Sequence, residues 1–371
     1  MLRSPLFDAV LRGFAFVAAT QGAAAEVPLR VDDPSALFVS PLSIEPLAEP
    51  RWVVHTLRPR DKLGRVAARY GVELADLRAW NHLDPNESPA KRRKTLRVLA
   101  RRIPPAPLKI AYVVQSGEDW DDVAAKLRVS RRALQASARR RGPLAAGATV
   151  VTWIDPLEGP AFEPDAAPLD VALELPTDAR SVGLPQRGRL EHGASLPASP
   201  LWTLAHPSRA FGSSHTLAVL RDAFTTLRND IGYRGEVTIG ALSRPHGGRF
   251  APHRSHQSGR DIDIRLPLVA GLGDDVRHPG VDDIDWYATW AIVDAFLRTG
   301  EVEAVFLELG RHERLYTAAR ILGVPRERLQ EIIRWANWSG HVIVKHSEGH
   351  DTHIHVRIRC GDDEPRCRTE E

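Results

Sequence analysis

Two short segments of the chain alternate strictly between apolar and titratable residues, DIDIRL at 261–266 and HIHVRIR at 353–359. Side chains of a β-strand point alternately to opposite faces, so this period of two predicts a strand in each segment. The titratable residues are Asp261, Asp263 and Arg265 in the first segment and His353, His355 and Arg357 in the second. The fold must therefore bury one face of these strands and leave the other face to polar groups.

The region that contains these strands, residues 180–371, is long enough to bury a core of its own. Helical periodicity extends over 216–229 and 287–298, and further strand candidates are EVTIGAL at 236–242 and VEAVFLE at 302–308. Helices mixed with alternating strands predict an α+β domain with an antiparallel sheet.

The length of 371 residues suggests two or three domains. Hydrophobic residues make up 43% and charged residues 26%, values that exclude wholesale disorder and a multi-span membrane protein. Fifty Lys and Arg against 47 Asp and Glu give a net charge of +3. This excess is too slight for a dedicated nucleic-acid binder, so we expect no nucleic-acid partner, although an anionic polymer is not excluded.

Residues 1–25 have the features of a signal peptide. Arg3 and Arg12 precede an apolar run at 13–19, and the alanines at 23–25 are small residues of the kind that signal peptidase accepts. These features predict cleavage after Ala25 and export. The alternative is an ordinary amphipathic N-terminal helix. No later segment approaches the roughly 20 apolar residues that span a bilayer, so we expect no transmembrane span.

Two blocks of similar sequence precede the C-terminal region. Aligning Asp61 with Glu118 also aligns Leu77 with Leu134, which gives a repeat offset of 57 residues. Each block reads strand, helix, helix, strand. The expected organisation is a signal peptide at 1–25, a linker at 26–50, the repeats at 51–100 and 110–155, a second linker at 156–179 and the C-terminal domain at 180–371.

The two blocks resemble LysM domains, small βααβ modules that bind glycans containing N-acetylglucosamine. The first block has an opening hydrophobic strand, the acid Asp61 before its first helix, and LRAWN, where Asn81 matches a frequent asparagine of that family. The resemblance implies that Asp61 and Asn81 contribute to glycan binding. The second block has Ala138 where Asn81 would align, which favours a weaker glycan site or a packed spacer without a ligand.

Histidines gather just before each titratable strand. His246, His253 and His256 precede the first, and Gly259 allows a turn that brings His256 over Asp263. Imidazole and carboxylate groups are good zinc ligands, and catalytic zinc takes three protein ligands with one position left for water. His256, Asp263 and His355 supply such a set. The alternative is a metal-free surface cluster, which is less compatible with so many histidines in two short segments.

These segments resemble the penicillin-insensitive murein endopeptidases, zinc metallopeptidases of the LAS group. The resemblance begins with SVGLPQRGRLEHGASLP at 181–197 and includes GGRFAPHRSHQSGRDIDI and GHDTHIHVRIRC. The group's HxxxxxxD motif falls on His256 and Asp263, and its terminal HxH motif falls on His353 and His355. The resemblance implies zinc binding by His256, Asp263 and His355, with His253 near the metal. It further implies a catalytic role for His353 and for His350.

The same resemblance implies a substrate. It is the D-alanyl to meso-diaminopimelyl cross-link of peptidoglycan in the periplasm, cleaved without an acyl-enzyme and therefore insensitive to penicillin. Arg244, Arg249 and Arg265 are candidates to bind its carboxylates. The two cysteines, Cys360 and Cys367, would close a small disulfide loop in an exported protein.

Two other kinds of function remain open from the sequence. One is a non-catalytic peptidoglycan-binding protein, which the complete set of His and Asp residues disfavours. The other is a related metallopeptidase, such as a D,D-carboxypeptidase or an L,D-endopeptidase, with the same zinc site and a different substrate pocket. A serine hydrolase is disfavoured because the chain has no GxSxG motif.

Overall fold

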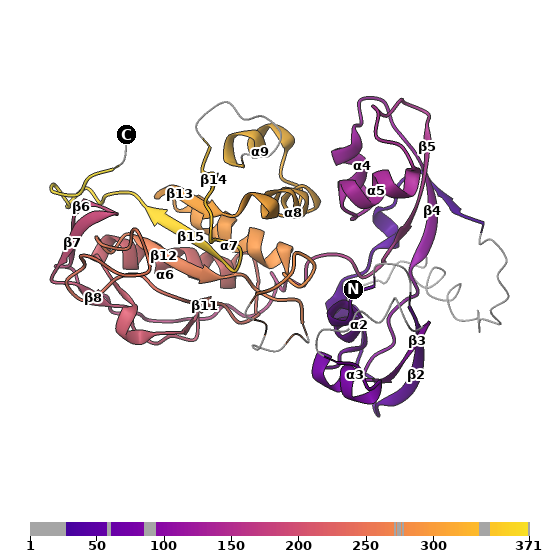
Figure 1. Ribbon diagram of the computed structural model, residues 1–371, viewed down its shortest axis with the longest axis horizontal. Coiled ribbons are helices and arrows are strands. Elements are labelled where there is room, and N and C mark those ends of the chain that lie inside the picture. Colours follow the sequence, from indigo (N-terminus) through magenta and orange to yellow (C-terminus); the bar gives the residue numbers. More distant parts are fainter. Residues whose placement is uncertain are drawn as a thin grey trace.

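The computed structural model describes residues 27–57, 61–84, 94–270, 272, 276, 278–333 and 342–369. The expected signal peptide therefore lies outside the described residues. Two small modules lie at one end of the molecule and a larger unit of helices and strands at the other (Figure 1). Within the described ranges, no helix combines the length and the apolar character needed to cross a membrane.

The first small module places two helices between two paired strands. β2 (Arg51–Thr56) pairs antiparallel with β3 (Thr95–Ala100), and α2 (Leu63–Tyr70) and α3 (Leu74–Trp80) connect them. Apolar residues three or four apart on each helix face the strands, because this spacing lies on one side of a helix. α2 ends at Gly71, whose φ of 69° is readily adopted without a Cβ atom. The expected βααβ order is confirmed.

The second module repeats this order. Its elements are β4 (Leu108–Val113), α4 (Trp120–Lys126), α5 (Arg131–Ala138) and β5 (Thr149–Ile154). β4 and α4 begin 57 residues after β2 and α2, as the sequence alignment predicts, whereas β5 begins only 54 residues after β3. Relative to the 57-residue offset, the closing strand therefore begins three residues earlier in the second module.

Part of the segment expected to be a linker at 26–50 is built into the second module. β1 (Leu29–Val31) pairs in parallel with β4 and adds a third strand to the module's sheet. Phe38 packs against the module's core, with the Arg128 guanidinium 4.2 Å from its ring centroid. A three-residue strand is too short to show a period, so no local pattern indicated it.

A six-stranded sheet forms the centre of the C-terminal unit, in the order β14-β13-β15-β12-β11-β9. Its strands are β9 (Thr203–Leu204), β11 (Thr238–Ile239), β12 (Asp261–Arg265), β13 (Val302–Leu307), β14 (Val344–His346) and β15 (His353–Ile358). The four central strands pair antiparallel, but β14 on β13 and β9 on β11 are parallel. The expectation of an antiparallel sheet is correct for the centre and wrong for both edges.

The apolar face of the central strands is buried under two helices, α6 (Ser214–Asn229) and α7 (Trp286–Arg298). Ile262 and Ile354 belong to one core with Phe224 of α6 and Phe296 of α7, whose rings meet edge to face at 6.2 Å. Both helices lie where the sequence predicts them, within two residues. The opposite face of β12 and β15 carries the titratable side chains.

Further short elements surround this sheet. α8 (Leu309–Ile321) and α9 (Arg326–Ile332) follow β13 and were not expected from the sequence. β6 (Arg180–Leu184) and β7 (Arg187–Glu191) form a hairpin, and β8 (Ala194–Ser195) pairs with β10 (Phe211–Gly212).

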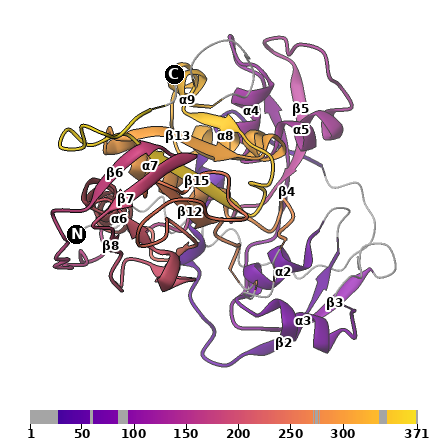
Figure 2. The same cartoon turned by 60° about the vertical axis from the view of Figure 1, so that its left-hand side comes forward.

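The small modules contact the C-terminal unit through charged groups and through Leu272, which packs against the core of the first module. α4 lies beside α8 in both views of the fold (Figures 1 and 2), with Arg320 pairing to Asp122 at 2.8 Å and Arg326 pairing to Asp119. The Glu158 carboxylate accepts from Arg65 of α2 at 2.6 Å and from the hydroxyl of Tyr287 in α7 at 3.1 Å. The segment at 156–179 is thus more than a tether, because its apolar residues also pack on the C-terminal core. These residues are Phe162, Leu169, Val171, Leu173 and Leu175.

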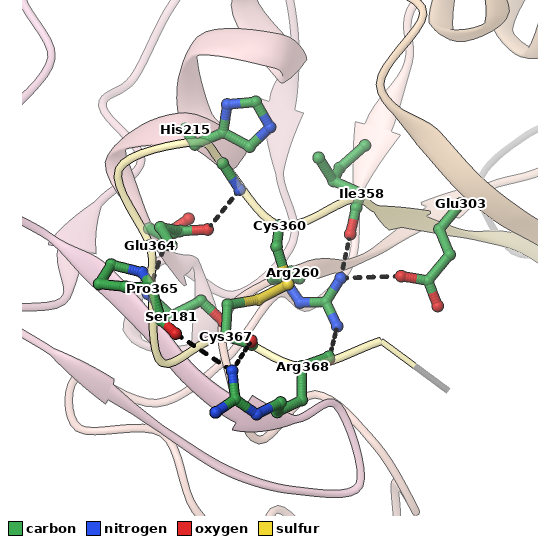
Figure 3. The surroundings of a disulfide bond; sticks show 12 residues. Ser181, His215, Arg260, Glu303, Ile358, Cys360, Glu364, Pro365, Cys367 and Arg368 are labelled. Atoms are coloured by element: carbon green, nitrogen blue, oxygen red, sulfur yellow. Dashed lines mark hydrogen bonds and ion pairs between the residues drawn. A yellow bond between two sulfur atoms is a disulfide. The ribbon is translucent and has the colours of Figure 1, made fainter. Parts of the chain in front are cut away.

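The expected disulfide between Cys360 and Cys367 is confirmed. It closes the loop that follows β15, and Glu364 within this loop accepts from the backbone N–H of Ser181 at 2.8 Å (Figure 3). Arg260, which is fully buried, donates to the carbonyl oxygens of Ile358 and Arg368 on either side of the disulfide. The C-terminal tail is therefore fixed against both β6 and the start of β12.

Candidate metal centre

The pairing of β12 with β15 brings the titratable residues of both strands together. Asp263 lies directly opposite His355, and Arg265 lies directly opposite His353. Residues opposite each other in an antiparallel pair project from the same face of the sheet. Two segments that are about 90 residues apart in sequence thereby contribute to one polar surface, as their alternation predicts.

The loop between β11 and β12 places His256 over this surface. Its backbone φ of 67° is in the left-handed region, which is uncommon for a residue with a side chain. Two hydrogen bonds hold this conformation: the N–H of His256 donates to Asp261 Oδ2 at 2.7 Å, and the Ser243 hydroxyl donates to the His256 carbonyl at 2.6 Å. Gly259, with a φ of 74°, makes the turn into β12 that the sequence predicts.

Imidazole nitrogens surround the Asp263 carboxylate. Oδ1 lies 3.1 Å from His256 Nε2, 3.4 Å from His355 Nδ1 and 3.6 Å from His353 Nε2. Oδ2 lies 3.5 Å from His253 Nδ1. Asp263, His256 and His355 are each no more than 5% exposed. His253, His256 and Asp263 each offer one ligand atom, and these atoms lie within 4.8 Å of one another.

The donor atoms of the centre fit a metal ion. His256 Nδ1 donates to the Leu242 carbonyl at 2.7 Å, which leaves Nε2 with a lone pair directed at Asp263. His355 Nε2 lies 2.9 Å from Asp261 Oδ1, which leaves Nδ1 as the nitrogen facing Asp263. His256 Nε2 and Asp263 Oδ1 are buried and have no hydrogen-bond partner among the described residues. Buried polar atoms of this kind require an explanation, and a cation between them supplies one.

Burial and mutual contact set the charges in the centre. Burial raises the pKa of Asp263, but the adjacent His256 and His355 outweigh it and hold the pKa well below its ordinary value. Burial lowers the pKa of His256, but Asp263 outweighs it, and the net pKa lies above the ordinary value. Without a metal, His256 therefore keeps its proton to a higher pH than an ordinary histidine does. A metal ion must displace that proton.

Two further histidines border the centre and are held neutral. Burial lowers the pKa of His353 to about 4, and it also lowers the pKa of His350. Their ring centroids are 4.9 Å apart, and His350 Nδ1 donates to the Glu348 carbonyl at 3.0 Å. A neutral imidazole can accept a proton, so both groups are available as bases at pH 7.

The three candidate arginines lie at different places around the centre. Arg265 is exposed and paired across the sheet with His353. The Arg244 guanidinium lies 5.5 Å from the centroid of Phe250, whose ring lies 5.0 Å from that of His253. Arg249 is exposed on the same loop. Arg265 is therefore next to the centre on β12, whereas Arg244 is connected to it through Phe250 and His253.

The residues expected to bind glycan have partners within the first module. Asp61 Oδ2 lies 3.2 Å from His55 Nε2, and His55 also contacts the Tyr70 hydroxyl. Asn81 is 4% exposed, and its amide donates to two carbonyls and accepts from the Arg97 N–H. Its side chain thus fixes α3 to β3 and is not presented to solvent. The position that differs in the second repeat is therefore a packing position.

Asp261 and Phe306 belong to the centre although the sequence assigned them no role. Asp261 is fully buried and contacts both metal-binding candidates, and the Phe306 ring meets the His355 ring edge to face at 5.2 Å. Asp261 lies on the titratable face of its strand, so the alternation that identified Asp263 also indicated Asp261. No sequence pattern indicated a role for Phe306.

The centre has the donor set of a catalytic metal site on the polar face of a mixed sheet. Comparison with known proteins shows what the C-terminal unit and the first module are similar to. Residues 181–278 match the model of the penicillin-insensitive murein endopeptidase family, and residues 55–89 match that of the LysM domain. The endopeptidase resemblance and the LysM resemblance of the first block are confirmed, and they support a hydrolase of the murein endopeptidase family preceded by a LysM domain. The LysM resemblance of the second block stays a prediction.

Several curated relatives carry the name penicillin-insensitive murein endopeptidase. The Citrobacter koseri protein is 24% identical over 52% of this chain and 71% of its own length. The Yersinia enterocolitica protein is 29% identical over 36% of this chain, which spans about half (48%) of the relative. An Escherichia coli protein is 23% identical over 53% of this chain and 72% of its own length. The spore cortex-lytic enzyme SleL of Bacillus cereus, a solved structure, is 19% identical over 27% of this chain and 22% of its own, with a TM-score of 0.12.

Proposed function

We propose that this protein is a zinc-dependent peptidoglycan endopeptidase that hydrolyses the D-alanyl to meso-diaminopimelyl cross-link in the periplasm. The proposal rests on two distances: His256 Nε2 lies 3.1 Å and His355 Nδ1 lies 3.4 Å from the same oxygen, Asp263 Oδ1. The other nitrogen of His256 donates to the Leu242 carbonyl, and that of His355 lies 2.9 Å from Asp261 Oδ1. Two imidazoles and one carboxylate form a frequent ligand set of catalytic zinc.

Zinc held there would act as a Lewis acid for the scissile carbonyl and would lower the pKa of a water molecule to about 7. His353 would accept the proton that this water loses, because burial keeps its imidazole neutral and its Nε2 faces the same Asp263 oxygen as the ligands do. His350, whose ring centroid lies 4.9 Å from that of His353, is a second neutral imidazole. The protonated base would then stabilise negative charge on the tetrahedral oxygen.

The cross-link substrate carries free carboxylates, and arginine binds carboxylates with two parallel hydrogen bonds. Arg265, opposite His353 in the sheet, and Arg244, 5.5 Å from the centroid of Phe250, would bind these carboxylates and orient the peptide. Arg249 on the same loop is a third candidate. Because this chemistry uses no serine nucleophile, a β-lactam would have no group to acylate.

The LysM-like modules would hold the enzyme on its insoluble substrate. Binding to glycan raises the local concentration of cross-links without any added contact at the catalytic centre. The first module matches the LysM family and is the better candidate for this role. The second module docks on α8, which gives it a structural task independent of glycan.

Digestion of purified muropeptides tests the proposal. Zinc-loaded protein should convert the cross-linked dimer into two monomers, identified by mass, and should leave monomeric pentapeptide intact. Release of D-alanine from the pentapeptide would indicate a D,D-carboxypeptidase, and cleavage after an L-residue would indicate an L,D-endopeptidase. His256→Ala is the inactive variant, and His246→Ala, an exposed histidine of the same loop, is its matched control. Glycan binding without any cleavage would support a non-catalytic wall protein.

A further inference from the structure

We propose that Asp261 is the positioning residue of the metal centre, a single carboxylate that fixes the orientation of both histidine ligands. The inference rests on the proposed function, because it assigns His256 and His355 to the metal. Asp261 is the first residue of β12, two positions before Asp263, and is 0% exposed. It is not itself directed at the proposed metal position.

Each carboxylate oxygen of Asp261 contacts a different ligand. Oδ2 accepts from the backbone N–H of His256 at 2.7 Å, and Oδ1 lies 2.9 Å from His355 Nε2. Oδ1 also accepts from Arg357 Nε at 2.8 Å. One buried side chain therefore joins the loop before β12 directly to the strand β15.

The contact with His256 acts on the backbone. A left-handed φ is unfavourable for a residue with a side chain and persists only where neighbouring groups hold it. The hydrogen bond from the His256 N–H to Asp261 stabilises this backbone conformation, and the hydrogen bond from the Ser243 hydroxyl to the His256 carbonyl also stabilises it. Loss of the Asp261 acceptor would free this backbone to relax and would move Nε2 away from Asp263.

The contact with His355 acts on the ring. Asp261 Oδ1 lies 2.9 Å from His355 Nε2, and the negative carboxylate favours the tautomer that carries its proton on Nε2. The lone pair is then on Nδ1, the nitrogen that faces Asp263. A neutral group in place of the carboxylate would weaken the preference for this tautomer. Carboxylate partners of metal-binding histidines typically change metal affinity about 10-fold to 100-fold when they are removed.

Arg357 supplies a positive charge that offsets the cost of burying the Asp261 carboxylate. Its guanidinium pairs with Asp261 and lies 5.1 Å from the centroid of Phe306, the ring that also meets His355. The positive guanidinium thus lies directly against the buried carboxylate, on the side of Oδ1 that also faces His355.

The test is the zinc affinity of Asp261→Asn, measured by competition with a chromophoric chelator. We expect a loss of about 10-fold to 100-fold relative to the wild type. Glu303→Gln is the matched control, because it removes a carboxylate paired with buried Arg260 on the adjacent strand β13 but contacts neither histidine. It should bind zinc within about twofold of the wild type. The visible spectrum of the cobalt-substituted protein should change in Asp261→Asn and not in Glu303→Gln, a difference that a general loss of stability would not produce.

Asp261→Glu keeps the buried charge while displacing both oxygens, so it serves as the second variant if Asp261→Asn does not fold. It should show the same loss of affinity and the same kind of spectral change. Wild-type affinity and an unaltered cobalt spectrum in the folded variant would overturn the positioning role. A wild-type protein that binds no zinc would instead refute the proposed function, so the two failures are distinguishable.

Discussion

His256 Nε2 and Asp263 Oδ1 lie 3.1 Å apart in the interior of the C-terminal unit, and neither has a hydrogen-bond partner among the described residues. The hydrogen bond from His256 Nδ1 to Leu242 assigns the lone pair to Nε2 whenever the ring is neutral. A neutral His256 and an ionised Asp263 would then direct two lone pairs at each other. The arrangement is stable with a proton between the two atoms or with a metal ion.

Zinc binding should therefore release protons. The pKa of His256 is raised by Asp263, so the folded protein without metal retains a proton on this ring at pH values where an ordinary histidine has lost it. Zinc must displace this proton, and zinc affinity should fall as the pH is lowered through this range. Calorimetric titration of zinc in two buffers of different ionisation enthalpy measures the number of protons released. Equal apparent enthalpies in both buffers would show that no proton is displaced.

His353→Ala should retain zinc but lose most of its rate. The imidazole borders the centre and is neutral, and a general base or oxyanion stabiliser contributes about 100-fold to 10,000-fold to a rate. Zinc content and the turnover of soluble muropeptide dimers should be measured on the same preparation. If His353→Ala releases zinc as readily as His355→Ala, the roles of the two strand histidines are reversed.

Reduction of the Cys360–Cys367 disulfide should lower the free energy of unfolding by about 2.5 kcal/mol, the chain-closure value for so short a loop. The double variant Cys360→Ser with Cys367→Ser should show a similar loss. Denaturant titration with and without reductant gives the difference for the wild type, and the double variant, insensitive to reductant, is the control. Thiols that titrate in unfolded, non-reduced protein would contradict the bond.

Removal of residues 27–155 should leave cleavage of soluble dimers nearly unchanged and weaken binding to whole sacculi. The residues of the candidate centre all follow β7, and the second module meets α8 through ion pairs near the surface, each of which stabilises the protein only slightly. Sedimentation with sacculi and turnover of soluble dimers separate the two effects. A truncated protein that sediments as the full chain does would show that the modules do not bind the wall.

A longer truncation, of residues 27–179, is the matched comparison and should unfold at a lower temperature. It removes five apolar residues at 162–175 that pack on the C-terminal core. Each partly buried side chain of this size contributes on the order of 1 kcal/mol, and domains are stable by only about 5–15 kcal/mol. Equal melting temperatures for the two truncations would show that this segment is a simple tether.

The sequence predicted those elements whose residues repeat with a clear period. β12 and β15 alternate over five or six residues, and α6 and α7 are long enough to show a helical period, so all four lie close to their expected positions. β1, β9 and β14 have only two or three residues each, and their parallel pairing depends on tertiary contacts that no local pattern records.

The residues of the candidate site also divide into those that a sequence pattern indicates and those that it does not. Asp263, His256 and His355 were identifiable because their spacing on strands and turns is fixed by backbone geometry. The role of Asn81 was not, because an amide that binds a sugar and one that joins α3 to β3 have the same place in the sequence. The partners of Asp261 lie on different segments of the chain, so its contacts with both histidines become visible only after folding.

If the C-terminal unit holds one zinc ion through His256, Asp263 and His355, the metal content of the purified full-length chain should depend on these side chains. It should be measured alongside His256→Ala, His355→Ala and the control His246→Ala. We expect about one zinc per wild-type and His246→Ala chain, and loss of both zinc and hydrolysis in the other two variants. A wild-type protein without tightly bound zinc after equilibration with the metal, or full retention of zinc in both ligand variants, would contradict this assignment.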